Sequence, residues 1–119
     1  MQKIKKNKYG NVRAKGSDSK IEIKHYNELL IREKACEIKD IVKQPKFELQ
    51  KGFKYFNETV RAISYTADFQ YFDIKRNITI IEELKSSYTA KLADYRIRAR
   101  LFQYQIKDRS DLLFIETIK

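Results

Sequence analysis

Two alternating segments joined by a short turn constrain the fold of this chain most. Residues 60–72 and 78–85 place apolar side chains at every second position over much of their length, as half-buried β-strands do. Residues 73–77 contain aspartate and asparagine, which suit a tight turn. The pattern predicts an antiparallel hairpin in which position 68 lies across from position 83. One face of the first strand is expected to carry Ile63, Tyr65, Ala67, Phe69 and Tyr71.

Helical patterns lie on both sides of this hairpin in the sequence. Residues 19–22 fit a capping box and predict a helix that starts near Ser19 and ends at about residue 35 or 36. Residues 90–105 repeat apolar side chains at spacings of three and four and predict a second helix. Residues 46–50 and 111–118 are predicted strands. The order of helix, strands, helix and strand predicts one small α/β domain, with a central mixed β-sheet flanked by helices.

The charge of the chain favours an anionic partner. The sequence contains 26 lysines and arginines against 16 aspartates and glutamates, a formal net charge of +10. Nucleic acid is the first candidate and an anionic membrane surface the second. Residues 1–20 hold seven basic residues and one acidic residue, so they carry more than half of the excess. We interpret residues 1–16 as a flexible basic arm, or simply a disordered tail, and residues 17–119 as the folded domain.

Several classes of protein and site do not fit the sequence. No apolar run is long enough to cross a bilayer, and the basic start MQKIKKNKYG lacks the apolar stretch of a signal peptide. A single Cys36 fits a reducing compartment, where we expect it to be a buried thiol. The single His25 does not suit a zinc site and is expected at the surface or in packing. The sequence shows no glycine-rich phosphate loop and no Ser-His-Asp set.

Acidic residues converge on one end of the predicted hairpin. Asp68 lies across from Glu83, and Glu83 shares a strand face with Lys85, whereas Glu82 points to the other face and is expected to be structural. Two carboxylates repel each other unless a cation lies between them, and their oxygens suit Mg²⁺ or Mn²⁺. Glu22 falls within the apolar stripe of the first helix. It serves either the capping box or a metal or active site.

This combination resembles the PD-(D/E)XK nuclease superfamily. The resemblance is carried by Asp68 and by Glu83-Leu84-Lys85 in their strand–turn–strand context, with Ala67 in place of the proline of the motif. Over residues 17–105 the chain is also similar to a family of small phage and prophage proteins, usually described as of unknown function and assigned to this superfamily. The matching segments are Ser19-Lys20-x-Glu22, Glu37-Ile38-Lys39-Asp40, Gln44-Pro45-Lys46-Phe47-Glu48-Leu49, Arg61-Ala62-Ile63-x-Tyr65-x-Ala67-Asp68-Phe69, and Tyr95 with Leu101-Phe102.

The resemblance implies a restriction-endonuclease-like core and a metal-dependent DNA endonuclease. Glu22, Asp68 and Glu83 would hold Mg²⁺, with Mn²⁺ as an alternative, Lys85 would assist catalysis, and Gln44 would support the site. By analogy the substrate would be branched DNA, such as a Holliday junction, cut by a homodimer in the cytoplasm of a phage host. Two alternatives stay open: a non-enzymatic DNA-binding or phage–host interaction protein on the same scaffold, and a restriction-type enzyme that cuts ordinary duplex.

Basic and aromatic side chains complete the candidate DNA contacts. The predicted phosphate contacts are Lys3, Lys5, Lys6, Lys8, Arg13 and Lys15 in the arm, and Lys91, Arg96, Arg98 and Arg100 on the second helix, where a solvated helix face is the alternative. Residues 51–58 are predicted to connect two strands of a hairpin, with 51–52 and 57–58 as turn residues. Their aromatic residues Phe53, Tyr55 and Phe56 either pack as a small satellite cluster, which we expect, or lie on a DNA or dimer surface.

Overall fold

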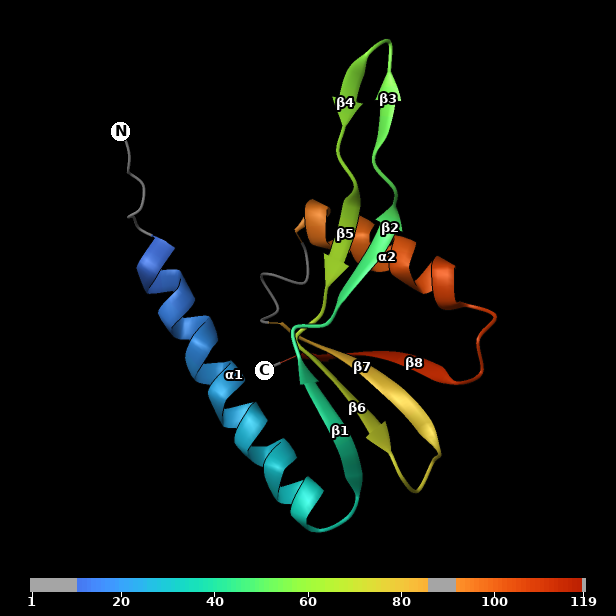
Figure 1. Ribbon diagram of the computed structural model, residues 1–119. Helices are drawn as coiled ribbons and strands as arrows, with labels where there is room; N and C mark the ends of the chain where they lie inside the picture. Colours follow the sequence, from blue (N-terminus) through green and yellow to red (C-terminus); the bar gives the residue numbers. More distant parts are fainter. Residues whose placement is uncertain (1–10, 86–91, 119) are drawn as a thin grey trace.

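A mixed four-stranded sheet lies at the centre of the computed structural model, which describes residues 11–85 and 92–118 (Figure 1). Its strand order is β1-β6-β7-β8, with antiparallel pairs except for the parallel pair β7–β8. The elements of this core are α1 (Asn11–Lys34), β1 (Ile38–Lys43), β6 (Phe69–Asp73), β7 (Ile78–Lys85), α2 (Ala93–Ile106) and β8 (Leu112–Ile118). The predicted α/β class, the mixed sheet and the order of elements are confirmed.

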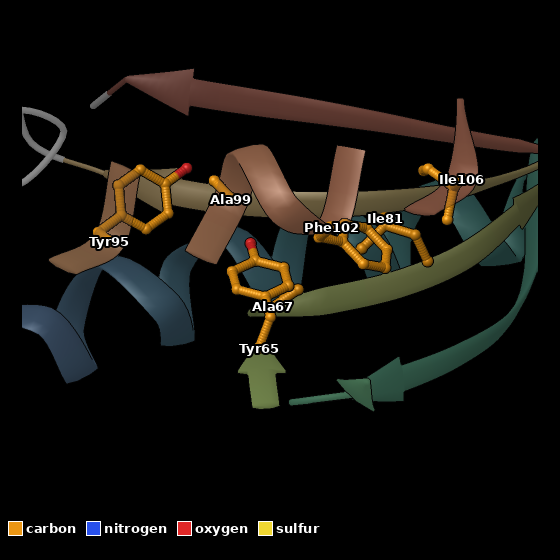
Figure 2. Close-up of a cluster of buried hydrophobic side chains, with 7 residues drawn as sticks. All are labelled: Tyr65, Ala67, Ile81, Tyr95, Ala99, Phe102 and Ile106. Carbon is orange, nitrogen blue, oxygen red and sulfur yellow. The ribbon is translucent and has the colours of Figure 1, made fainter. Parts of the chain in front are cut away.

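The two helices cover opposite faces of the sheet because β7 alternates its side chains between them. Ile81 packs with α2 residues in a buried cluster that Figure 2 shows, whereas Ile80 and Leu84 pack on the α1 side with Leu29. The α2-side cluster consists of Tyr65, Ala67, Ile81, Tyr95, Ala99, Phe102 and Ile106. Phe102 is fully buried, and burial of one such side chain stabilises a fold by roughly 1.5–3 kcal/mol. Strand β7 is therefore buried on both faces of the sheet and contributes to both clusters.

Four further strands form an arm that projects from this core (Figure 1). The base of the arm pairs β2 (Lys46–Gln50) with β5 (Ile63–Thr66), and its tip pairs β3 (Phe53–Tyr55) with β4 (Glu58–Val60). Phe56 and Asn57 form the turn at the tip, where both have positive φ angles. We refer to residues 46–66 as the β-arm. The predicted satellite packing of its aromatic residues is wrong, because Phe53, Tyr55 and Phe56 are exposed.

The predicted strand over residues 60–72 is interrupted at Ala67 and Asp68, which belong to no strand. Tyr65 before the break and Ala67 within it pack on the α2 side, whereas Phe69 and Tyr71 after it pack on the α1 side. The prediction that these odd-numbered residues share one face is therefore wrong. Backbone hydrogen bonds hold the break in place: Ala67 N donates to the Pro45 carbonyl (3.0 Å), and Asp68 N donates to the Glu82 carbonyl (3.1 Å).

The first helix also differs from its prediction. It begins at Asn11 rather than near Ser19, so it runs through Gly16, and Ser19 does not cap it. Residues 11–16 of the predicted basic arm therefore belong to α1, and residues 1–10 lie outside the described part of the chain. Cys36 follows the helix with a φ of 62° and is exposed, so the predicted buried thiol is wrong. Within the described chain, neither helix combines the length and apolar character that a bilayer span requires.

Candidate active site

The end of β7 carries an acidic side chain paired with a lysine. Glu83 and Lys85 point to the α2 side of the sheet, and the Lys85 Nζ lies 3.0 Å from the Glu83 Oε2. The Tyr65 hydroxyl donates a hydrogen bond to the other carboxylate oxygen, Glu83 Oε1. The Lys85 ammonium also lies 4.4 Å from the centre of the Tyr95 ring, which attracts the cation. Tyr65 and Lys85 thus hold the buried Glu83 carboxylate in one orientation, and Tyr95 holds Lys85.

Asp68 lies across the hairpin from this pair, as the alternation predicts. Its carboxylate Oδ2 accepts a hydrogen bond of 2.7 Å from the backbone N–H of Leu84, between Glu83 and Lys85. The break in the strand makes this bond possible, because Asp68 is released from regular pairing while its neighbour Phe69 still pairs with Glu82. The hairpin therefore brings Asp68, Glu83 and Lys85 to the same end of β7.

The electrostatics of Glu83 reflect this crowding. Burial is the main cause that raises its pKa to about 7, and repulsion from Asp68 adds to the rise. The hydrogen bond from Tyr65 and the charge of Lys85 act in the opposite direction without cancelling it. Burial together with the Glu83 hydrogen bond also raises the pKa of Tyr65, which therefore stays a donor. A divalent cation beside Asp68 and Glu83 would relieve the repulsion, and carboxylate oxygens are ligands that Mg²⁺ and Mn²⁺ prefer.

Glu22 and Gln44 adjoin Asp68 from the other side of the sheet. A cavity of about 310 Å³ is lined by Glu22, Ile23, Tyr26, Lys43, Gln44, Asp68 and Phe69. Glu83 and Lys85 project toward α2 instead, so Asp68 is the residue that links the two groups. Among the described residues, no three Asp, Glu, His or Cys side chains already form a metal site. Joint ligation by Glu22, Asp68 and Glu83 therefore requires their side chains to move together.

Gln44 is held in an uncommon backbone conformation beside Asp68. Its φ is 51°, in the left-handed region that costs a non-glycine residue roughly 1–2 kcal/mol. The Gln44 N–H donates to the Asp68 carbonyl at 2.9 Å, and the neighbouring Pro45 carbonyl accepts from Ala67. These two bonds hold Gln44 and Pro45, which precede the β-arm, against Ala67 and Asp68, which follow it. Strain of this kind is often found where a chain positions functional groups.

Glu82 lies on the opposite face of β7 and is fully engaged there. Its carboxylate accepts hydrogen bonds from His25 Nε2 (2.9 Å), the Tyr71 hydroxyl (2.9 Å) and the Thr117 hydroxyl (2.6 Å). Burial would raise the pKa of Glu82, but the bonds from His25, Thr117 and Tyr71 outweigh burial and leave it below the usual value. Because this network joins α1, β6, β7 and β8, Glu82 connects elements of the core. His25 is buried in it, in the packing role expected from the sequence.

The predicted phosphate contacts are only partly described. Lys3, Lys5, Lys6, Lys8 and Lys91 lie outside the described residues, and Arg13 and Lys15 lie in α1 without described side chains. Arg98 donates to the Ser64 carbonyl in the base of the β-arm (2.6 Å) and to Asp94 (3.2 Å), so it holds α2 against the arm. Arg96 and Arg100 are exposed and line a surface hollow of about 150 Å³.

Sequence reasoning missed the residues that surround Glu83. The sequence places Tyr65 on a strand face and Tyr95 in the second predicted helix, and both lie in the segments that carry the resemblance, but it gives neither a role at the site. Tyr95 donates a hydrogen bond to Glu116 as well as facing Lys85. Tyrosine rather than phenylalanine at two core-facing positions was the available signal, because a buried hydroxyl requires a partner. Both hydroxyls find a carboxylate at the candidate site.

The comparisons with known proteins give a family and no assigned function. The chain belongs to the family described as "Protein of unknown function (DUF1064)", whose sequence profile matches residues 2–119. No curated protein matches the chain, and no solved structure does.

Proposed function

We propose that this protein is a metal-dependent DNA endonuclease that cuts branched DNA and is related to the PD-(D/E)XK superfamily. One observation carries the proposal: Asp68, Glu83 and Lys85 converge where β6 and β7 meet, with the Glu83 carboxylate buried and crowded by Asp68. A pure DNA-binding protein would gain nothing from carboxylates at this place, because they repel phosphates. A helix on each face of a mixed sheet also agrees with the core that the resemblance implies.

In the proposed reaction Asp68 and Glu83 would hold Mg²⁺ or Mn²⁺, and Glu22 would join them from α1. The bound ion would polarise the scissile phosphate and lower the pKa of its water. Lys85 orients the attacking water and offsets charge on the phosphate, while Tyr65 keeps the Glu83 carboxylate in place. Gln44 fixes the backbone of Asp68. We propose that a homodimer makes the two symmetric cuts of a four-way junction inside the host cytoplasm.

Cleavage of labelled DNA tests the proposal. Wild type, Asp68→Asn and Lys85→Met are incubated with a four-way junction or a matched linear duplex, in Mg²⁺, Mn²⁺ or EDTA. Asp108→Asn and Lys107→Met are the matched controls, because both residues are exposed and pair with each other. We expect metal-dependent cutting of the junction that both site variants reduce at least about 100-fold, with DNA binding and helical circular dichroism unchanged.

Each other outcome corrects a named part of the proposal. If Asp68→Asn cuts at the wild-type rate, the site is wrong. If only the linear duplex is cut, the enzyme is of the restriction type and the junction assignment fails. If wild type binds DNA tightly and cuts neither substrate with either metal, the protein is a DNA-binding protein on this scaffold.

A further inference from the structure

The tip of the β-arm exposes three aromatic side chains in one place. Phe53, Tyr55 and Phe56 are 46%, 62% and 84% exposed, although aromatic side chains normally contribute to cores. The ring centres of Tyr55 and Phe56 lie 4.7 Å apart in an edge-to-face arrangement, so they form one continuous apolar edge. Packing against the described residues, 11–85 and 92–118, leaves these three side chains exposed, so the edge is available to a partner.

The turn places Phe56 at the outermost point of the arm. Phe56 has a φ of 48° and Asn57 a φ of 68°, the left-handed pair of a two-residue hairpin turn of type I′. Glycine, asparagine and aspartate are the usual residues there, because a bulky side chain in this region costs roughly 1–2 kcal/mol. A phenylalanine at this position reduces the stability of the hairpin and presents a flat ring to the exterior.

Charged side chains on the arm favour an anionic partner. The arm exposes four basic residues against two acidic ones: Lys46, Lys51, Lys54 and Arg61 against Glu48 and Glu58. Lys54 lies between Phe53 and Tyr55 in β3, so its side chain projects from the other face of the hairpin, where it donates to the Thr59 hydroxyl at 2.9 Å. Flat aromatic rings together with lysines are the combination with which proteins bind unpaired nucleotides, where rings stack on bases and lysines contact phosphates. A second copy of the tip would bring like charges together.

The arm is anchored directly at the candidate active site. Its first strand follows Gln44 and Pro45, and its last strand precedes Ala67 and Asp68. Two backbone bonds, from Gln44 to Asp68 and from Ala67 to Pro45, close its base. The ten residues from Lys46 to Tyr55, which include β2 and β3, extend at most roughly 30 Å, about nine base steps of 3.4 Å. DNA held at the site would therefore reach the tip within one turn of duplex.

We propose that the tip of the β-arm binds unpaired or unstacked bases next to the branch point, with Phe56 and Tyr55 stacking on bases and the exposed basic residues of the arm contacting phosphates. The inference rests on the proposed function only in placing branched DNA at the candidate active site. It assigns the preference for branched over linear DNA to the arm rather than to the residues at the end of β7.

Binding without metal tests the arm separately from cleavage. In EDTA, a four-way junction, a single strand and a linear duplex are titrated with wild type, with a Tyr55→Ala, Phe56→Ala double variant, and with Tyr104→Ala. Tyr104 is the matched control, because it is 72% exposed on α2 and lies outside the arm. We expect the double variant to bind the junction and the single strand at least about tenfold more weakly, and the linear duplex within about twofold of wild type. Tyr104→Ala should match wild type on all three.

The same measurements can overturn the proposal. Wild-type affinity of the double variant for the junction overturns it, as does an equal loss on all three DNAs. Light scattering is run on the same samples, and if the double variant becomes monomeric while wild type is dimeric, the tip is an interface between copies instead. Failure of the nuclease proposal looks different, since wild type would then bind the junction through the arm and leave it uncut in Mg²⁺.

Discussion

Glu82 and Glu83 are neighbours in β7, yet their surroundings on the two faces of the sheet shift the pKa values of the two carboxylates in opposite directions. Both are almost completely buried, at 3% and 4% exposure, so burial does not distinguish them. On the α1 side three donors satisfy Glu82 and lower its pKa. On the α2 side burial raises the pKa of Glu83 to about 7, and repulsion from Asp68 adds to the rise.

The difference separates a structural carboxylate from a candidate functional one. A carboxylate that accepts hydrogen bonds from His25, Tyr71 and Thr117 joins elements of the core and gains little from a further ligand. A carboxylate that repels a second one gains most from a cation. The surroundings of each group, rather than its burial or residue type, therefore indicate which face carries chemistry.

Exchanging each glutamate for glutamine is the strongest test of the difference between Glu82 and Glu83. We expect Glu83→Gln to reduce metal-dependent cleavage about 1000-fold while the protein stays folded, because glutamine lacks the charge that holds a metal ion. Glu82→Gln should instead lower the free energy of unfolding by about 2 kcal/mol, because its charged hydrogen bonds are weakened. Junction cleavage and urea unfolding measure the two effects. The assignment of the faces is refuted if Glu82→Gln abolishes cleavage at full stability.

The pH dependence of stability should also have opposite signs for the two residues. The folded protein binds the Glu83 proton more tightly than the unfolded chain does, so Glu83 favours folding at low pH. That contribution, up to about 3 kcal/mol, is lost as the pH rises through about 7. Glu82 contributes stability at neutral pH that is lost as the pH falls through its lowered pKa.

Urea unfolding in EDTA between pH 4 and pH 9 checks both signs against the glutamine variants. Relative to wild type, Glu83→Gln should become more stable as the pH rises, and the deficit of Glu82→Gln should shrink at acidic pH. Parallel curves for the two variants would show that Glu82 and Glu83 titrate alike.

The smallest expected effect compares a tyrosine on each face. Tyr65→Phe removes the hydroxyl that donates to Glu83, so the pKa of Glu83 should rise further and the pH of half-maximal cleavage should shift upward by about one unit or less. Tyr71→Phe removes a donor to Glu82 and should cost about 1 kcal/mol of stability without moving the cleavage profile. If Tyr65→Phe and Tyr71→Phe shift the pH–rate profile by the same amount, the proposed difference between the two faces of β7 is wrong.

The hairpin was predictable from sequence, whereas the break in its first strand was not. Strand β7 has the bounds that the sequence predicts, residues 78–85. Its side chains alternate between two apolar clusters, one on the α2 side and one on the α1 side. The same alternation runs through Ala67 and Asp68 without interruption, since apolar side chains suit either face. The reversal there depends on backbone bonds to Pro45 and Glu82, which no local pattern encodes.

The part of the candidate site that adjacent strands of the hairpin bring together was predictable from the sequence, and the rest was not. Asp68, Glu83 and Lys85 come together through pairing of adjacent strands, and this placement follows from turn position and period. Tyr65 and His25 reach their carboxylates from other elements, 18 and 57 residues away in sequence, so pattern alone does not pair them. The predicted helix start near Ser19 is wrong because α1 runs through Gly16, and a helix tolerates one glycine at a cost of about 1 kcal/mol.

The closed base of the β-arm makes the tip of the arm exchangeable. The two ends of the arm lie side by side at Gln44 and Asp68, and its base has to keep Tyr65, which packs in the α2-side cluster and donates to Glu83. Loop-closure entropy changes by only about 0.6 kcal/mol when a connection doubles in length, so a shorter or longer tip would cost the domain little. Proteins that share this core could therefore diverge in what they bind by replacing residues 51–62 alone.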